Sequence, residues 1–305
     1  MRRASKSIKR SNHLLLFWVL AFTAIIYLAI SGEWEISKAT RTKPFIESSA
    51  AILLDLESGA VLYDKNSEAP MQPASMSKMM TELIVLEQVN EGAAAWSDRV
   101  SVSRYAAEVL GSQIGFNEGE RFTVRELFEA MTVSSANDAA VALAEYIGGS
   151  ETGFVELMNK RARELGFSES SVFGNATGLT VNDLHLHKEA AASQETLMTA
   201  EDTGKLAAYL LKKFPEVLEV SNRGNVKLAS NGQTLAATNQ MLPGKAFSYS
   251  GNDGLKTGYT AQAGYCFTGT AKRDGRRLIS VVMGASTAEE RFVETELLLD
   301  YGFQS

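Results

Sequence analysis

The sequence predicts an α/β fold, with an antiparallel sheet built from N- and C-terminal strands, flanked by helices, and with an inserted helical lobe. Two observations lead to this prediction. Strand-like segments occur near both ends of the body of the chain, and residues 75–215 between them are mostly of helical character. Strands from both termini that surround a helical middle bury their apolar faces most simply by pairing in one sheet.

The N-terminal strands are expected at residues 50–56 and 60–63, because two apolar runs flank Glu57-Ser58-Gly59, as in a hairpin. Helical spacing of apolar residues follows over 126–147 and 152–165. Another helix is expected to begin at Thr199, which precedes two acidic residues and an apolar stripe.

The C-terminal strands are expected at 265–272 and 277–284, on either side of Asp274-Gly275. An Asp-Gly pair between two apolar runs is a strong hairpin signal. A last amphipathic helix is predicted over 287–301. These strands complete the sheet that the N-terminal hairpin begins.

The composition excludes several classes of protein. The 305 residues are 45% hydrophobic and 22% charged, which is ordinary globular usage and not that of a disordered, collagen-like or multi-span membrane chain. The net charge is −6, and the first 31 residues contain bases but no acid, so the body is more acidic than the whole. Nucleic acid is therefore not expected as a partner. The single cysteine, Cys266, excludes an intramolecular disulfide.

The N-terminus resembles an export signal. Bases up to Arg10 precede the uncharged segment from Leu14 to Ile30, and a small-x-small sequence ends at Ser31. Residues 1–31 are therefore predicted to be a signal peptide or an N-terminal membrane anchor, and residues 32–46 a polar stem. Either alternative places the body, residues 47–305, outside the cytoplasm.

The first candidate for chemistry is Ser75-Met76-Ser77-Lys78. Pro73 suits a helix entry, and Ser75 and Lys78 then lie on one helix face, one turn apart. A serine hydroxyl is a weak nucleophile that needs a base, and a desolvated lysine can serve as that base. An ordinary helix start with a solvated lysine would give the same short pattern.

The second candidate is Ser135-Ala136-Asn137, in which Ser135 can relay a proton and Asn137 can hold a substrate amide. A helix cap is the structural alternative. A similar triplet, residues 250–252, lies in a Gly/Asn/Asp-rich segment and is interpreted as a turn.

The third candidate is Lys256-Thr257-Gly258, ahead of the apolar strand 265–272. Lys256 and Thr257 at a strand edge can bind a carboxylate, and Gly258 allows a close approach to the backbone. Such a strand can also supply an N–H to an oxyanion hole. A plain turn is the structural alternative here, but the three motifs in this order after an export signal are much more specific than any one of them.

Together, the three motifs resemble the set found in penicillin-binding proteins and class A β-lactamases. Within that superfamily the chain is most similar to the low-molecular-weight serine D-Ala-D-Ala carboxypeptidases. The resemblance covers about residues 47–303 and implies a β-lactamase/DD-peptidase-like fold. The matching stretches are Pro73–Thr81, Val133–Ala140 and Gly254–Thr260, with a weaker match at Phe173–Leu179.

The resemblance implies a substrate and catalytic roles. The substrate is a peptidoglycan stem peptide that ends in D-Ala-D-Ala, and β-lactams are expected to acylate the same serine. Ser75 is the implied nucleophile, Lys78 its general base, and Ser135 the residue that passes a proton to the leaving nitrogen. No metal or organic cofactor is implied.

The resemblance also implies substrate-binding roles. Asn137 would position the peptide, Lys256 would polarise Ser135, and Thr257 would help to bind the terminal carboxylate. Gly258 and Tyr259 complete the predicted binding strand, and the N–H groups of Ser75 and Tyr259 would form the oxyanion hole.

The chain departs from the family pattern at Ala136, where a glycine is most common; the change is small because this position offers only backbone. Many relatives continue into a β-rich domain and an amphipathic membrane helix after the segment that this chain matches, which favours the N-terminal anchor over C-terminal attachment, while a cleaved signal peptide stays an alternative. An endopeptidase that cuts D-amino-acid cross-links, and a β-lactam sensor or wall-binding scaffold without turnover, remain alternatives. A β-lactamase fits less well, because the Leu-Asn pair of its deacylating Glu segment occurs nowhere in the chain.

Overall fold

The computed structural model describes Trp18, Thr23 and residues 42–304. It divides the chain into two units, Met1–Lys43 and Pro44–Ser305, and the second contains all the elements described below. The predicted signal or anchor segment lies outside the described residues, except for Trp18 and Thr23. Among the described residues, the model contains no helix with the length and apolarity needed to cross a membrane.

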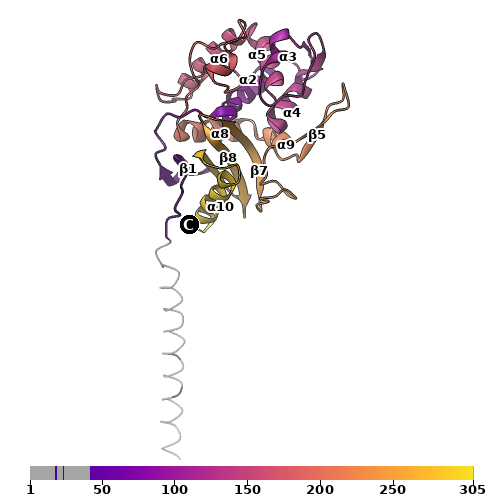
Figure 1. Cartoon of the computed structure of the whole chain (residues 1–305). Helices are drawn as coiled ribbons and strands as arrows, with labels where there is room; N and C mark the ends of the chain where they lie inside the picture. Colours follow the sequence, from indigo (N-terminus) through magenta and orange to yellow (C-terminus); the bar gives the residue numbers. More distant parts are fainter. Residues whose placement is uncertain (1–17, 19–22, 24–41, 305) are drawn as a thin grey trace, which may run out of the picture. The chain divides into compact units, whose positions relative to one another are not determined.

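The second unit is built on a five-stranded antiparallel sheet with strand order β2-β1-β9-β8-β7 (Figure 1). The strands are β1 Ala50–Asp55, β2 Val61–Lys65, β7 Asn252–Thr260, β8 Gly264–Arg273 and β9 Arg276–Ala285. Both predicted hairpins are confirmed, and the second turns at Asp274 and Gly275, which both have positive φ angles. The predicted fold class is confirmed, since strands from the two ends of the chain pair directly between β1 and β9.

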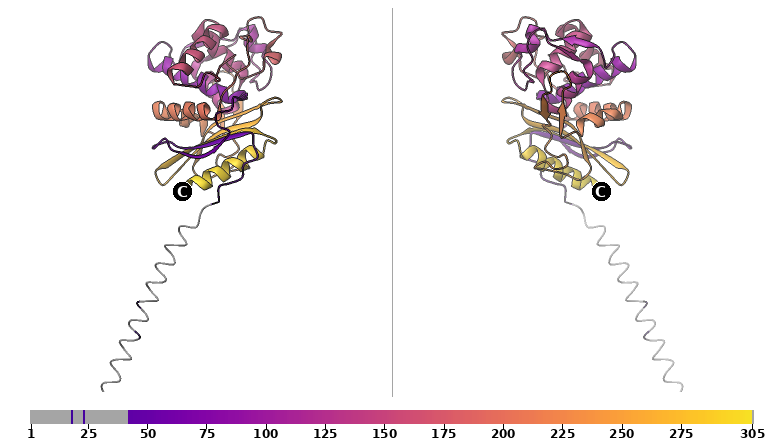
Figure 2. Two further views of the ribbon diagram at one scale, coloured as in Figure 1. Left: turned by 90° about the vertical axis from the view of Figure 1, so that its left-hand side faces the viewer. Right: turned by 90° about the vertical axis from the view of Figure 1, so that its right-hand side faces the viewer.

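Helices cover both faces of the sheet (Figure 2). Alternate residues of β1 point to opposite faces, so Ile52 packs in the core on the side of α8 Ala200–Lys213, and Leu53 packs on the side of α10 Glu290–Phe303. Thr199 caps α8 as predicted, by accepting a hydrogen bond from the N–H of Asp202. The sheet is therefore buried between two helical layers.

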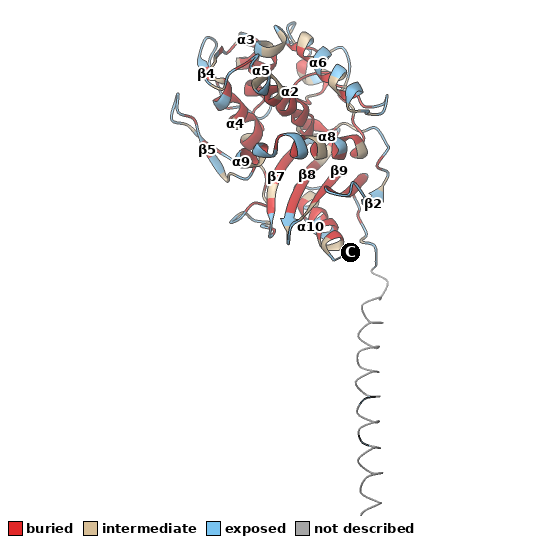
Figure 3. Ribbon diagram, turned by 180° about the vertical axis from the view of Figure 1, so that it is seen from behind, coloured by how far each residue is buried: buried red, intermediate tan, exposed pale blue. Residues whose placement is uncertain are grey.

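The helical lobe follows the predicted central segment and holds the largest cluster of buried apolar side chains. Figure 3 shows that α2, at the centre of the lobe, is buried along most of its length. The elements between β2 and α8 are η1 Ala74–Ser77, α2 Lys78–Asn90, β3 Arg99–Ser101, α3 Arg104–Glu108, β4 Arg121–Thr123, α4 Val124–Ser134, α5 Asn137–Gly148, α6 Glu151–Glu164 and α7 Val181–Leu184. Those between α8 and β7 are η2 Pro215–Val217, α9 Leu218–Ser221, β5 Asn225–Lys227 and β6 Thr234–Ala236.

The helical segment predicted over 126–147 is two helices, because the chain breaks at Ser135. This residue ends α4 in the left-handed conformation, with φ 64°. The short pairs β3–β4 and β5–β6 were not predicted, since three-residue strands carry too little pattern to detect.

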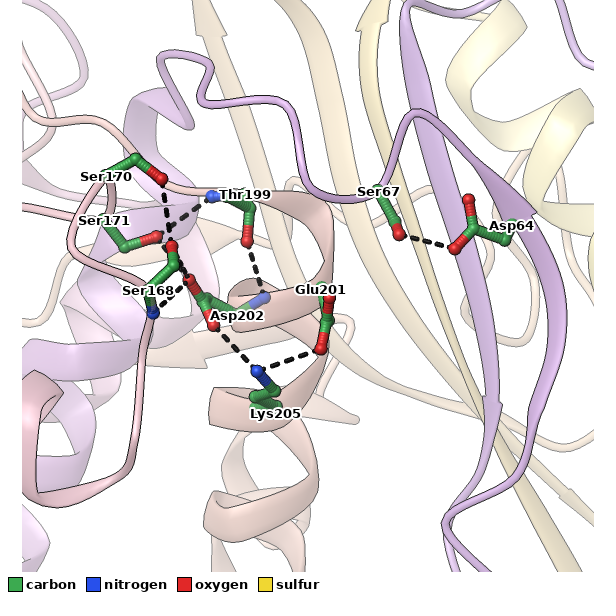
Figure 4. A network of polar contacts seen from close by, with 9 residues as sticks. All are labelled: Asp64, Ser67, Ser168, Ser170, Ser171, Thr199, Glu201, Asp202 and Lys205. Carbon is green, nitrogen blue, oxygen red and sulfur yellow. Dashed lines mark hydrogen bonds and ion pairs between the residues drawn. The ribbon is translucent and has the colours of Figure 1, made fainter.

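The segment that leads into α8 is anchored by a buried carboxylate (Figure 4). Asp202 accepts hydrogen bonds from the hydroxyls of Ser168 and Ser171 and from the N–H of Ser168. Lys205 donates to its other oxygen. This network fixes the connection that runs from the lobe back to the sheet.

Candidate active site

The first motif forms a serine–lysine pair at the base of the lobe. Ser75 lies in η1 and Lys78 begins α2, so the helical turn carries both side chains to one face. Lys78 Nζ lies 2.8 Å from Ser75 Oγ, within hydrogen-bond distance. Lys78 also donates to Asn137 Oδ1 at 2.6 Å and to the carbonyl oxygen of Thr177 at 2.8 Å. The amine is therefore aimed at the hydroxyl by two fixed acceptors.

Burial lowers the basicity of Lys78. Lys78 is fully buried, and this desolvation lowers its pKa well below the usual lysine range. The nearby charge of Lys256 lowers the pKa of Lys78 further, whereas the charges of Glu82 and Asp138 oppose the shift. A neutral amine next to a serine hydroxyl can accept its proton.

The second motif lies at the junction of α4 and α5, across from this pair. The left-handed turn at Ser135 presents its hydroxyl towards β7, and Asn137 begins the next helix. Asn137 Nδ2 donates to the carbonyl oxygen of Leu110 at 2.6 Å, while its Oδ1 accepts from Lys78. Asn137 thus connects Lys78 to the loop that contains Leu110.

The third motif lies on β7, at the edge of the sheet. Lys256 Nζ is 2.6 Å from Ser135 Oγ, so the lysine on the sheet and the serine on the lobe are directly hydrogen-bonded. Burial lowers the pKa of Lys256 to about 8, and Glu82 and Arg291 act on it in opposite directions. The Thr257 hydroxyl lies 2.7 Å from that of Thr238.

Gly258 lets the strand approach the serine. A Cβ atom at this position would lie 2.5 Å from the carbonyl oxygen of Pro73 and 3.2 Å from the backbone nitrogen of Met76. Glycine is therefore required here by the packing of β7 on η1. Gly178 packs on the same turn from the other side, and a Cβ there would overlap the carbonyl oxygen of Ala74.

These residues surround one open cavity of about 290 Å³. All eight predicted site residues line it or lie within hydrogen-bond distance of a residue that does. They are Ser75, Lys78, Ser135, Asn137, Lys256, Thr257, Gly258 and Tyr259. The half-exposed ring of Tyr259 stacks on Tyr265 with 4.3 Å between ring centroids. Hydrophobic side chains are otherwise few at the wall.

Arg291 lines the same cavity and was not predicted. It lies near the start of α10, donates to the carbonyl oxygen of Gly258 at 3.1 Å and packs against the rings of Tyr265 and Phe292. No carboxylate of the described chain pairs with it in a salt bridge. An arginine in the first turn of a helix is unusual because the dipole favours acids there, but this local signal does not show that the side chain reaches the cavity.

The segment 173–179, noted above only for its resemblance, contributes backbone. The Thr177 carbonyl accepts from Lys78, and Gly178 and Leu179 line the cavity. A backbone acceptor leaves no residue-type signal, so Thr177 could not have been identified from the sequence. Cys266 is buried, and burial raises the pKa of its thiol to about 11.

The geometry is that of a serine–lysine pair in a cleft between a sheet edge and a helical lobe, an arrangement typical of serine acyl-transfer enzymes that use a lysine base. A family model for peptidase S11, described as D-alanyl-D-alanine carboxypeptidase, matches residues 37–287. The chain belongs to this family.

Individual relatives agree with the family match. The chain is 39% identical to D-alanyl-D-alanine carboxypeptidase DacF of Bacillus subtilis over 260 residues, which cover 84% of this chain and 62% of the relative. It thus spans less than two thirds of the length of this relative, and the same is true of DacC of Escherichia coli, at 33% identity and 64% of its length.

Solved structures show the same fold. Penicillin-binding protein D2 of Listeria monocytogenes, in its ampicillin-bound form, matches 86% of this chain and all of its own, with a TM-score of 0.72 and 36% identity. The peptidoglycan synthesis regulatory factor PBP3 of Streptococcus pneumoniae matches 85% of this chain and 74% of its own, with a TM-score of 0.80 and 36% identity.

Proposed function

We propose that the protein is a serine-type D-alanyl-D-alanine carboxypeptidase that removes the terminal D-Ala from peptidoglycan stem peptides. The observation that carries this proposal is the hydrogen bond between Lys78 and Ser75, in a cleft that also holds Lys256 and Ser135. Family membership supports the substrate class.

The acylation step follows from the two lysines. Neutral Lys78 accepts the Ser75 hydroxyl proton as Oγ attacks the carbonyl carbon of the penultimate D-Ala. The N–H groups of Ser75 and Tyr259 are the proposed donors to the oxyanion. Ser135, which is hydrogen-bonded to Lys256, passes a proton to the leaving D-Ala nitrogen, and the C–N bond breaks. The proton that Lys78 took from Ser75 then returns to Ser135, so Lys78 is neutral again before deacylation.

Deacylation uses the same groups in the reverse direction. Water attacks the ester carbonyl, its proton passes to the base, and Ser75 regains a proton as the shortened peptide leaves. A β-lactam would open its ring at the same step and acylate Ser75. Thr257 donates its hydroxyl proton to Thr238, so Arg291 and the remaining hydroxyl proton of this pair offer a cation and one donor for the substrate carboxylate.

We further propose that the catalytic unit, residues 47–305, acts outside the cytoplasm. The basic start and the uncharged run to Ile30 support export through residues 1–31, as a cleaved signal or a retained anchor. The membrane would then contact the protein only through this segment.

The test is D-alanine release by the purified full chain from a peptide that ends in Lys-D-Ala-D-Ala, with Ser75→Ala as the control. Multiple turnovers that the control lacks are the expected result. No release, combined with penicillin labelling of Ser75, would favour a cross-link endopeptidase or a non-turnover sensor. Cross-linked dimeric peptide as a second substrate separates these two.

A further inference from the structure

A third ionisable side chain lies in the interior close to the two lysines. Glu82 follows Lys78 by four residues on α2, so both side chains project from one face of this helix. Glu82 is only 1% exposed. Its Oε1 makes no hydrogen bond within the described part of the chain.

Other buried carboxylates of the lobe have evident structural partners. Glu151 accepts hydrogen bonds from the Tyr105 hydroxyl and from the N–H groups of Ala176 and Ala191. Asp202 holds the serine loop of Figure 4. A carboxylate buried without such donors costs several kcal/mol. Glu82 therefore needs a different explanation from these two residues.

The groups that act on Glu82 come from three elements. Lys256 on β7 and Lys78 on α2 supply positive charge, and Thr132 on α4 brings a hydroxyl near Glu82, although its Oγ1 makes no hydrogen bond within the described part of the chain. Asp138 on α5 acts on Lys78 and is held by the N–H groups of Ile114 and Gly115. The acids of α6 and α8, Glu151 and Asp202, have the partners given above. Glu82 thus faces the two active-site lysines.

The balance of charge among Lys78, Lys256 and Glu82 shows what one carboxylate can do next to two buried lysines. Two buried ammonium groups would repel each other and pay a large desolvation cost, so both cannot remain charged without compensation. A single negative charge compensates one of them. We propose that Glu82 is a positioning residue of the reaction centre, whose buried charge keeps Lys256 protonated while Lys78 stays neutral. This inference rests on the proposed function, since it assigns the two lysines the roles given there.

The pKa shifts of Glu82 and Lys256 agree with this arrangement. Burial raises the pKa of Glu82 to about 7, and the lysine charges oppose that rise. Burial lowers the pKa of Lys256 to about 8, and the charge of Glu82 opposes that fall. Each charge therefore favours the ionised form of the other group, so ionised Glu82 favours the protonated Lys256 that the mechanism requires.

The test compares the pH dependence of penicillin acylation between the wild-type full chain and Glu82→Gln. The wild-type rate should fall above about pH 8, where Lys256 loses its proton. We call this fall the alkaline limb of the pH profile. Without the negative charge of Glu82, the alkaline limb should begin about one pH unit lower. The variant should then react about tenfold more slowly at pH 9 and within about twofold of wild type at pH 6, where Glu82 is already protonated.

Two further variants separate charge from packing. Glu82→Met should also shift the alkaline limb to lower pH. Glu294→Gln is the control: Glu294 is a buried carboxyl on α10 that accepts a hydrogen bond from the N–H of Ser48. This variant should leave the alkaline limb where it is in the wild type. A Glu82→Gln protein that folds but loses rate equally at every pH, or whose limb does not move, overturns the proposal.

A wild-type measurement covers the case in which neither Glu82 variant folds. Carbon-13 NMR of glutamate-labelled protein should show a carboxyl with a midpoint near pH 7. The absence of any glutamate carboxyl that titrates between about pH 6 and 8 overturns the proposal. If penicillin does not acylate the wild-type chain at any pH, the proposed function is overturned as well. If acylation of the wild type is normal and the alkaline limb of the Glu82→Gln variant does not move, this inference alone is overturned.

Discussion

Lys256 and Ser135 are 121 positions apart in the chain, yet Nζ of the lysine lies 2.6 Å from Oγ of the serine. The lysine belongs to the edge strand of the sheet and the serine to the junction of two lobe helices. Their hydrogen bond joins the sheet to the lobe beside the cavity that Ser75 lines. The sheet and the lobe therefore both supply part of the candidate site.

Ser135→Ala is expected to lower the acylation rate by about 10²-fold or more, because the proton relay to the leaving group is lost. The backbone at Ser135 has φ 64°, which strains any residue with a Cβ atom. Ser135→Gly is therefore the matched variant: it removes the same hydroxyl but relieves the strain. Both should lose activity to a similar extent in penicillin-acylation kinetics, with Ser135→Gly melting at the higher temperature. Normal acylation by either variant would exclude the relay role.

Gly258→Ala is expected to impair catalysis through position alone. Its Cβ would lie 2.5 Å from the carbonyl oxygen of Pro73, so β7 and η1 must move apart. A displacement of about 1 Å can cost about 10²-fold in rate. Gly224→Ala is the control, because the nearest atom to its Cβ would be 3.7 Å away, and it should change neither rate nor melting temperature measurably. Equal rates for the two variants would contradict this account.

The sequence predicted the parts of this molecule that depend on local pattern. The hairpin at Asp274-Gly275 and the start of α8 at Thr199 follow from turn and capping chemistry within a few residues. The serine–lysine pair also followed from spacing on one helical turn. Each of these features needs only neighbouring residues, so one sequence suffices to identify it.

Contacts between distant segments could not be predicted in this way. No local pattern places Arg291 of α10 against Gly258 of β7, or the Thr177 carbonyl on Lys78. Glu82 was equally hidden, because a single acid in an apolar helix is recognised as buried only when the helices around it are known. Tertiary packing, rather than residue type, creates these parts of the site.

Lys78→Met is expected to lower acylation by about 10²- to 10⁴-fold, because the general base is lost. It should also change the pH dependence of stability. Burial lowers the pKa of folded Lys78 below the unfolded value of 10.5, so the unfolded chain binds more protons between these values. The wild type therefore gains stability as the pH rises through this window, and the variant lacks this gain.

Thermal unfolding at pH 6 and pH 9 tests this second effect. The difference in melting temperature, variant minus wild type, should be more positive at pH 6 than at pH 9. The reverse order would mean that Lys78 is charged in the folded protein at neutral pH, and the assignment of the base would have to move to another group.

Arg291→Gln is expected to weaken the use of substrates with a free C-terminal carboxylate. The Arg291 guanidinium lines the cleft without a carboxylate partner in a salt bridge among the described residues, and its bond to the Gly258 carbonyl holds it beside the binding strand. A hydrogen bond to a charged group contributes about 1.5–3 kcal/mol, so kcat/KM should fall about 10- to 100-fold. The same peptide with a C-terminal amide lacks the carboxylate, and its kcat/KM should fall much less. Arg291→Lys keeps the charge but not the planar guanidinium group, so kcat/KM should recover in part.

If Arg291 only supports the packing of α10, kcat/KM will fall by the same factor for both substrates. Steady-state kinetics with the two substrates distinguishes these roles.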